Sequence, residues 1–180
     1  MDALFFPVPL CRQATSYTCG VAALQSVLCY YGIETQEDQL SLSLHTNSVT
    51  GTDFRDILRV SHRYGFKADF LENRTLEWLK QHLTLHHPVI LLLQAWKTDE
   101  YDYDNSWLDS HYVVACGYTK DTILFMDPST LGYYTYIPID DLRKRWHGKD
   151  GTGEYIQSAI LVLPNYRPYP YVSNTFKLLK

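Results

Sequence analysis

The order of the secondary-structure signals predicts an α+β fold, in which a helical N-terminal half packs on a C-terminal antiparallel β-sheet. In the first half of the chain, apolar residues recur at three- and four-residue spacing, which is typical of amphipathic helices. A continuous apolar run at 89–93 then has the length of a strand that is buried on both faces. From His111 onward, short strand-like runs separated by turn residues predict successive antiparallel strands.

The helices are predicted from their apolar faces and end signals. Val21, Leu24 and Val27 lie on one face of a helix at about 19–31, and Gly32 is suited to end it. Further helices are predicted at 36–44, from Thr75 to Leu83 and at 140–146. Another is predicted to have Thr52 as its N-cap and to end at Gly65.

The strands are predicted from β-propensity and flanking turns. We expect them at 4–8, 66–71, 89–93, 111–118, 122–127, 133–137 and 156–163, with a glycine-rich loop at 148–153. The sequence shows no internal repeat and no linker. We therefore expect one domain at 1–165, followed by an extended tail at 166–180 with several prolines and tyrosines.

Composition excludes several classes of protein. The 180 residues are 46 % hydrophobic, which is enough for one core, and the net charge of −4 argues against a nucleic-acid partner, which requires a basic face. No apolar run is long enough to span a bilayer, and residues 1–9 lack the basic region and the longer apolar run of a secretory signal, so we expect no membrane insertion and a cytoplasmic location. The oligomeric state is not indicated.

The cysteines and histidines do not predict a metal site or a cofactor. Four scattered cysteines are too few for a disulfide framework, and none forms a Cys-x-x-Cys pair. The histidines include no His-Glu-x-x-His pattern, and the sequence has no phosphate-binding glycine loop.

Cys19 has the sequence context of a reactive thiol. A polar loop leads into the first turn of the predicted helix at Cys19, and the partial positive charge at a helix N-terminus favours the nucleophilic thiolate. Gln13, six positions earlier, is close enough for its amide to donate to the oxyanion of an acyl-transfer intermediate. The alternative is that Cys19 is a small buried residue at a helix start.

His111 and Asp127 are candidate partners for this thiol. If 119–121 forms a three-residue hairpin loop, Val113 faces Asp127, and His111 lies on the same face as a diagonal neighbour of Asp127. A two-residue loop would put the two side chains on opposite faces. A histidine can accept the thiol proton and a carboxylate can orient the imidazole. Taken singly, His111 could be a strand-end histidine and Asp127 the cap of an Asp-Pro-Ser-Thr turn.

Several motifs together resemble the peptidase family that removes double-glycine leader peptides from bacteriocins. They are Gln13 with Cys19-Gly20, the helix ending in Tyr30-Tyr31-Gly32, His111-Tyr-Val-Val and Met126-Asp127-Pro128. The resemblance covers about 10–165 and implies a papain-like cysteine peptidase fold. It also implies that Cys19 is the nucleophile, His111 the general base, Asp127 the orienting residue and Gln13 an oxyanion donor, with the Cys19 backbone N–H as a second donor.

The resemblance is incomplete in two respects. Members that process leader peptides are commonly fused to a transporter, whereas this sequence looks free-standing, so the leader substrate does not carry over. The local Cys-Gly-Ser-Cys-Trp signature of papain itself is also absent.

We therefore expect a thiol hydrolase that cleaves a peptide or isopeptide bond in a peptide or protein through an acyl-enzyme. The alternatives are an acyl transferase or glutamine deamidase with the same residues, and a non-catalytic peptide-binding domain of the same fold.

An acidic segment directly precedes His111. Residues 99–109 include five acidic and three aromatic side chains. One hypothesis is that this loop overhangs the cleft and favours basic or aromatic substrate segments; the alternative is a solvated surface loop.

Overall fold

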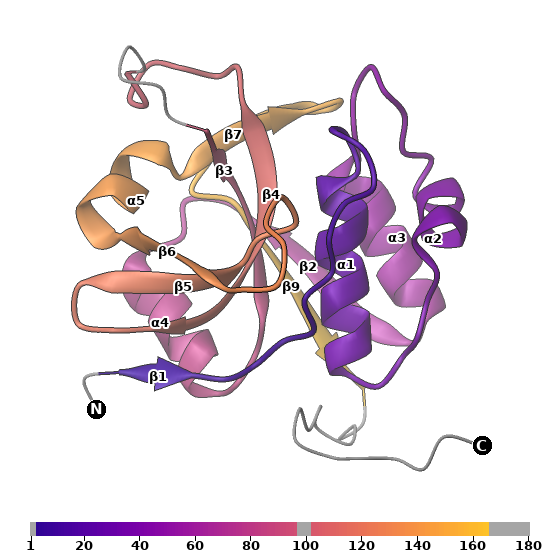
Figure 1. Cartoon of the computed structure of the whole chain (residues 1–180), viewed down its shortest axis with the longest axis horizontal. Coiled ribbons are helices and arrows are strands. Elements are labelled where there is room, and N and C mark those ends of the chain that lie inside the picture. The colour runs from indigo at the N-terminus through magenta and orange to yellow at the C-terminus, as the bar shows by residue number, and fades with distance from the viewer. Residues whose placement is uncertain (1–2, 97–101, 166–180) are drawn as a thin grey trace.

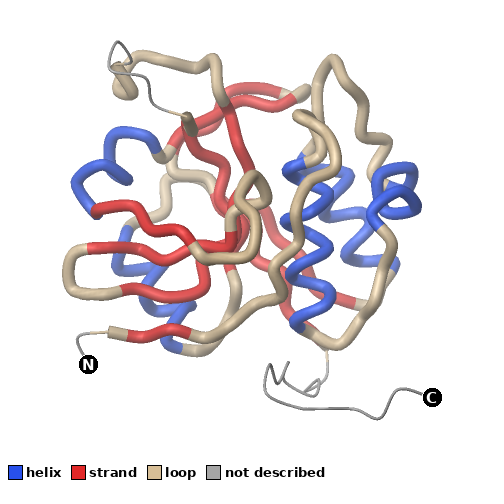
Figure 2. Tube along the Cα trace, viewed as in Figure 1, coloured by secondary structure: helices blue, strands red, loops and turns tan. Residues whose placement is uncertain are grey.

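The structure, a computed structural model, describes residues 3–96 and 102–165. Three helices, α1 (Cys19–Tyr30), α2 (Glu37–Ser43) and α3 (Phe54–Arg63), gather on one side of an antiparallel sheet (Figure 1). The later helices α4 (Leu76–Thr84) and α5 (Ile139–Arg145) contact the sheet itself. Figure 2 shows the same division between helices and strands. The predicted α+β fold is confirmed.

The main sheet has seven antiparallel strands. Its order is β2–β9–β3–β4–β5–β6, and β1 also pairs with β4. The strands are β1 (Leu4–Phe5), β2 (Phe66–Leu71), β3 (Val89–Gln94), β4 (Ser110–Tyr118), β5 (Thr122–Met126), β6 (Thr135–Pro138) and β9 (Ala159–Pro164). The predicted edge strand at 4–8 is therefore shorter than expected, and the last strand begins later.

The core lies between the helices and the sheet. All six residues of β3 are buried, as its apolar run predicts, because it lies between β9 and β4 in the sheet. Helix α1 packs against β4, and buried side chains of α1, α3, α4 and the strands form one cluster. This packing brings the N-terminus of α1 to the end of β4 where His111 lies.

The C-terminal end of α1 agrees with its sequence prediction, whereas the N-cap of α3 does not. Gly32 has a positive φ of 86°, and the N–H groups of Gly32 and Ile33 donate to the carbonyls of Cys29 and Leu28, which is the Schellman pattern. The prediction that Thr52 caps α3 is wrong. Asp53 is the N-cap and accepts from the Arg55 N–H at 2.8 Å, whereas Thr52 is buried and pairs with Thr46.

The turn between β4 and β5 differs from the predicted three-residue loop. Tyr118 pairs with Ile123, which leaves four residues in the loop. A β-bulge between Ala115 and Gly117 then shifts the register by one, so that Val114 pairs with Met126. The bulge restores the alignment that the shorter loop would have given, and His111 and Asp127 meet as predicted.

The glycine-rich segment forms a hairpin and not a loop. Strands β7 (His147–Asp150) and β8 (Gly153–Ile156) pair as a two-stranded ribbon joined by two residues. The two loop residues are Gly151 and Thr152, and the Asp150 carboxylate holds the turn by accepting from the Thr152 N–H at 2.8 Å.

Two further expectations concern the ends of the chain and membranes. The predicted tail at 166–180 lies outside the described residues. Within the described ranges, no helix is both long and apolar enough to cross a membrane.

The close approach of β1 to β4 at Gly117 predicts the effect of Gly117→Ala. An added Cβ would lie 2.5 Å from the Leu4 carbonyl oxygen, which is backbone and cannot move without shifting β1. We expect a loss of about 1–3 kcal/mol in the free energy of unfolding, measured by urea denaturation. Gly153→Ala is the matched control, because the nearest atom to its added Cβ is the end of a tyrosine side chain. Equal stability of both variants would contradict this packing.

Candidate active site

Cys19 is the first residue of α1 and is partly exposed. The preceding Thr18 makes no side-chain cap, because its hydroxyl is bonded within the loop to Thr15. The first-turn N–H groups of α1 are therefore not capped by that side chain, and the helix dipole acts at the sulfur. Gly20 allows close packing here, since an added Cβ would lie 2.7 Å from Thr52 Cβ.

His111 and Asp127 come together across β4 and the end of β5. The His111 Nε2–H donates to Asp127 Oδ1 at 2.7 Å, and the imidazole is only 1 % exposed. The same carboxylate oxygen accepts from the backbone N–H and the hydroxyl of Ser129, each at 2.8 Å. Asp127 is thus both a turn cap and the partner of His111, so the two interpretations of this residue are compatible.

The second ring nitrogen of His111 faces the thiol. Its Nδ1 is buried and makes no hydrogen bond within standard limits in the described part of the chain. The imidazole nevertheless interacts with Cys19, and this interaction lowers the pKa of the thiol and raises the pKa of the imidazole. Hydrogen bonds of this kind are often long until substrate binds.

The charges of these residues support one another. Burial raises the pKa of the Cys19 thiol, but contact with His111 and the N–H groups of Tyr112 and Gly20 outweigh burial and hold the pKa below 9.0. Burial lowers the pKa of His111, but Asp127 and Cys19 raise it to about 9. Burial raises the pKa of Asp127, and its bonds to His111 and Ser129 bring it below 3.8. The partners of Cys19 thus favour the thiolate, and those of His111 favour the imidazolium beside the Asp127 carboxylate.

The other three cysteines lack this environment. Burial raises the pKa of Cys11 and of Cys116 to about 12, and burial with the nearby Glu34 raises that of Cys29. Cys19 is the one thiol of the four whose pKa is lowered, which makes it the candidate nucleophile.

Gln13 is held in the loop that precedes α1. Its backbone N–H donates to the Pro128 carbonyl at 3.0 Å, which ties this loop to the turn after Asp127. Its side-chain Nε2 donates to the Thr15 carbonyl at 2.7 Å, and its Oε1 is buried without a partner among the described residues. An amide carries two N–H donors, so one remains for a ligand.

Two pockets flank the thiol–imidazole pair. One, of about 320 Å³, includes Cys19, Thr52, Tyr112 and Asp150 in its lining but not His111. The other, of about 130 Å³, includes His111, Asp127 and Arg145 but not Cys19. We call them the cysteine-side pocket and the histidine-side pocket. Cys19 thus borders the first pocket, and His111 with Asp127 borders the second.

Comparison with known proteins identifies the family. A family model described as the Peptidase C39 family matches residues 7–150. The chain belongs to this family. A search of curated proteins gives no match.

Solved structures share the fold of this C39 protein. The peptidase domain of Streptococcus ComA, a bifunctional ABC transporter, has 21 % identity and a TM-score of 0.67, over 88 % of this chain and 100 % of that one. A double glycine motif protease from an AMS/PCAT transporter, solved in complex with the leader peptide, has 18 % identity and a TM-score of 0.61. The match covers 89 % of this chain and 94 % of that one. A Carica candamarcensis cysteine protease in complex with E-64 has 14 % identity and a TM-score of 0.60. The match covers 92 % of this chain and 100 % of that one. The predicted papain-like fold is confirmed.

Sequence reasoning missed three residues of this C39 site. The Trp96 ring lies 4.7 Å from the His111 ring and covers it. The Tyr112 hydroxyl donates to Asp150 Oδ2 at 3.1 Å within the cysteine-side pocket. Tyr112 directly follows His111 in the sequence and Asp150 begins the Asp-Gly turn, but Trp96 gives no sequence signal because only the fold brings it to His111.

The acidic segment before His111 is partly described. Leu108 and Ser110 line the cysteine-side pocket, whereas Asp102 and Asp104 are exposed. Residues 97–101 lie outside the described ranges, and the preference for basic or aromatic substrates stays a prediction. Within the described ranges, no group of three or more His, Cys, Asp or Glu could hold a metal ion.

The lowered pKa of Cys19 predicts how its reactivity depends on pH. Because the thiolate predominates above the pKa, Cys19 should react with iodoacetamide at a lower pH than an ordinary thiol. In His111→Gln, burial remains but the imidazolium is lost, so the reactivity midpoint should rise by about one unit or more. Alkylation rates followed by mass spectrometry from pH 5 to 10 measure this shift. Superimposable profiles for the two proteins would show that His111 does not act on the sulfur.

Proposed function

We propose that this C39 protein is a thiol hydrolase that cleaves a peptide or isopeptide bond through an acyl-enzyme on Cys19. The observation that carries this proposal is the position of His111, which contacts Asp127 through Nε2 and interacts with Cys19. The pKa directions of all three residues favour the charge state that attack on a carbonyl needs.

The first half-reaction forms the acyl-enzyme. The Cys19 thiolate attacks the carbonyl carbon, a C–S bond forms, and the C=O electron pair moves onto oxygen. When the carbonyl re-forms, the C–N bond breaks and the His111 imidazolium gives its proton to the leaving amine. Asp127 keeps the imidazole oriented and stabilises its charge throughout.

The second half-reaction releases the acid. Neutral His111 accepts a proton from water, and the hydroxide oxygen attacks the thioester carbon. The C–S bond then breaks, the thiolate leaves and the imidazolium is restored. An acyl transferase would admit an amine at this step, and a glutamine deamidase would act on a side-chain amide, so both alternatives share the same thioester.

The oxyanion of the tetrahedral intermediate requires N–H donors near the Cys19 sulfur. The Cys19 backbone N–H lies in the first turn of α1, where N–H groups have no partner within the helix. We assign the second donor to the Gln13 amide, which retains one N–H after bonding to Thr15.

A double-mutant cycle at Cys19 and His111 tests the proposed pair. Cys19→Ala and His111→Ala should each lower the turnover of a Gly-Gly aminocoumarin peptide by about 10⁴-fold or more, and the double variant should be little worse. Cys29→Ala, in the same helix, is the control and should retain activity. Additive losses would mean that the two residues do not act together.

Gln13→Ala tests the oxyanion donor separately. Because the charge on oxygen develops only in the transition state, kcat should fall by about 10²- to 10³-fold while KM changes little. Steady-state kinetics measure both constants, and the alkylation rate of Cys19 shows whether its thiolate is preserved. A rise in KM with unchanged kcat would give Gln13 a binding role instead.

A further inference from the structure

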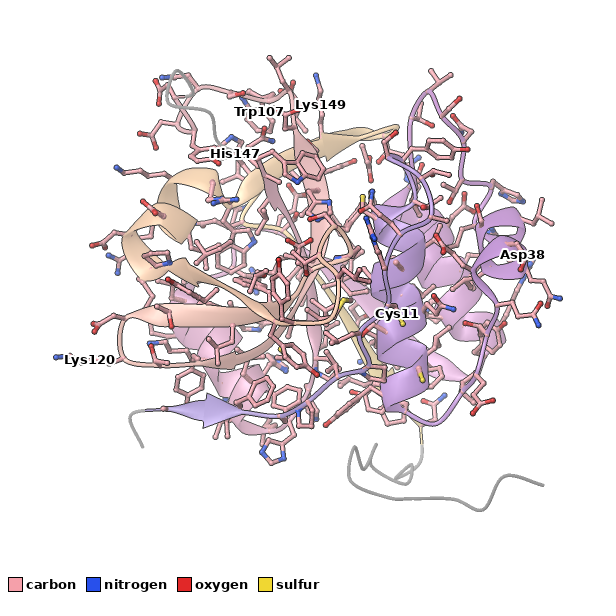
Figure 3. The ribbon with its side chains drawn as sticks, viewed as in Figure 1. Cys11, Asp38, Trp107, Lys120, His147 and Lys149 are labelled. Carbon is pink, nitrogen blue, oxygen red and sulfur yellow. The ribbon has the colours of Figure 1, made fainter. Side chains whose placement is uncertain are left out.

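The turn that follows β5 is bonded to the segment that precedes α1. It runs from Asp127 to Thr130, and the N–H and the hydroxyl of Thr130 both donate to the Asp127 carbonyl, at 3.1 and 3.0 Å. The Gln13 N–H donates to the Pro128 carbonyl at 3.0 Å. In Figure 3, Cys11, two residues before Gln13, lies beside α1. One turn therefore carries the Asp127 carboxylate and also holds the backbone of the proposed oxyanion donor.

Ser129, within this turn, makes two bonds to the Asp127 carboxylate. Its backbone N–H and its hydroxyl each donate to Oδ1 at 2.8 Å. The His111 Nε2–H donates to the same oxygen at 2.7 Å. All the hydrogen bonds that the described residues make to this carboxylate thus meet on one oxygen. Three donors on Oδ1 restrict its rotation away from the imidazole, because each bond to an ionised acceptor is strong and directional.

The hydroxyl is the part of this arrangement that depends on the residue type. Any residue except proline can donate a backbone N–H to an aspartate two positions earlier, as in an ordinary Asx turn. The second bond requires a side-chain donor, which serine provides and alanine lacks. The turn can therefore persist without the hydroxyl, whereas the carboxylate would lose one of the donors that hold it.

The direction of the Asp127 carboxylate decides how His111 is used. Because Oδ1 holds Nε2–H, the imidazole has Nδ1 left for proton exchange with Cys19, the thiol with which it interacts. A carboxylate that rotates away would orient the ring less well and would stabilise the imidazolium less. The bonds from His111 and Ser129 also bring the pKa of Asp127 below 3.8. Both the charge of the carboxylate and its direction thus involve Ser129.

Ser129 is a neutral neighbour of a carboxylate that otherwise faces cations. The charged groups that act on Asp127 are His111 of β4 and Arg145 of α5, and all three line the histidine-side pocket. Burial lowers the pKa of Arg145, and the Asp127 charge is among those that oppose this effect. Both cations remain when Ser129 is replaced by another neutral residue. Such a replacement therefore changes the support of the carboxylate without changing the net charge of the site.

We propose that Ser129 is a positioning residue of this site, whose hydroxyl holds Asp127 Oδ1 against the imidazole and so keeps His111 directed at Cys19. This inference rests on the proposed function, because Ser129 acts only through the pair of Cys19 and His111. It goes beyond that function by giving the imidazole and the Gln13 segment one common support, the turn from Asp127 to Thr130.

The pH dependence of Cys19 alkylation tests the positioning without a substrate. In Ser129→Ala, a carboxylate that is held less well stabilises the imidazolium less, so a higher pH is needed to form the thiolate. The midpoint of iodoacetamide labelling, followed by mass spectrometry from pH 5 to 10, should therefore rise, but by less than in His111→Gln. A midpoint equal to that of the wild type would overturn the inference.

Steady-state kinetics test whether this positioning affects turnover. Ser129→Ala should lower kcat for the Gly-Gly aminocoumarin peptide by about 10- to 100-fold, the loss expected for one hydrogen bond to a charged group, with KM changed by about twofold or less. Ser129→Thr keeps a hydroxyl at the same place and should retain most of the wild-type kcat. An unchanged kcat in Ser129→Ala, or an equal loss in Ser129→Thr, would contradict the role of the hydroxyl.

Thr130→Val is the matched control in the same turn. It removes the hydroxyl bonds to the backbone carbonyls of Asp127 and Tyr133 and leaves the bonds to the carboxylate in place. Both kcat and the alkylation midpoint should match the wild type, even if the melting temperature falls. Equal losses in Thr130→Val and Ser129→Ala would show that the stability of the turn, and not the position of the carboxylate, limits activity.

The outcomes separate this inference from the proposed function. Thermal unfolding shows whether Ser129→Ala is folded, and Ser129→Gly, which also lacks the hydroxyl but keeps the N–H, replaces it if it is not. Wild-type behaviour of the Ser129 variant together with a raised midpoint in His111→Gln would contradict only the role of Ser129. If the profile of His111→Gln superimposes on that of the wild type, the proposed catalytic pair fails, and the inference fails with it.

Discussion

Strand β4 is the constraint on which the site depends. It pairs with β3, β5 and β1, and α1 packs against it. This packing fixes His111 at the start of β4, next to the helix N-terminus that carries Cys19. The β-bulge between Ala115 and Gly117 compensates for the four-residue turn and keeps Asp127 diagonal to His111. A one-residue shift without this bulge would turn the two side chains to opposite faces.

The position of each cysteine in the fold decides whether the pKa of its thiol is raised or lowered. Cys19 and Cys29 lie in the same helix, yet the pKa of one is lowered and that of the other is raised. Cys19 begins the helix, where a buried imidazole and backbone N–H groups face its sulfur. Cys29 lies near the other end, where burial and Glu34 oppose ionisation. A buried charge is stable only with such partners, so contact with His111 and backbone N–H groups opposes the effect of burial on the pKa of Cys19.

The cysteine-side pocket is lined by residues of α1, β3, β4 and the β7–β8 hairpin. The C39 family model ends at residue 150, within the hairpin, and the two strands continue to Ile156. Asp150 of this pocket accepts from the Tyr112 hydroxyl of β4 and from the Phe54 N–H of α3, which attaches the hairpin to both elements.

The sequence by itself determined the elements and the candidate residues. Periodic apolar positions predicted the helices, and the continuous run of β3 predicted its burial, because these patterns depend on neighbours along the chain. Cys19 at a helix start and His111 with Asp127 at strand ends were also evident from local context. Tertiary structure alone decided the bulge that aligns His111 with Asp127, the Trp96 ring over His111 and the bonds of Asp150 to Tyr112 and Phe54. These contacts join residues far apart in the chain, and no local pattern encodes a distance between segments that only packing brings together.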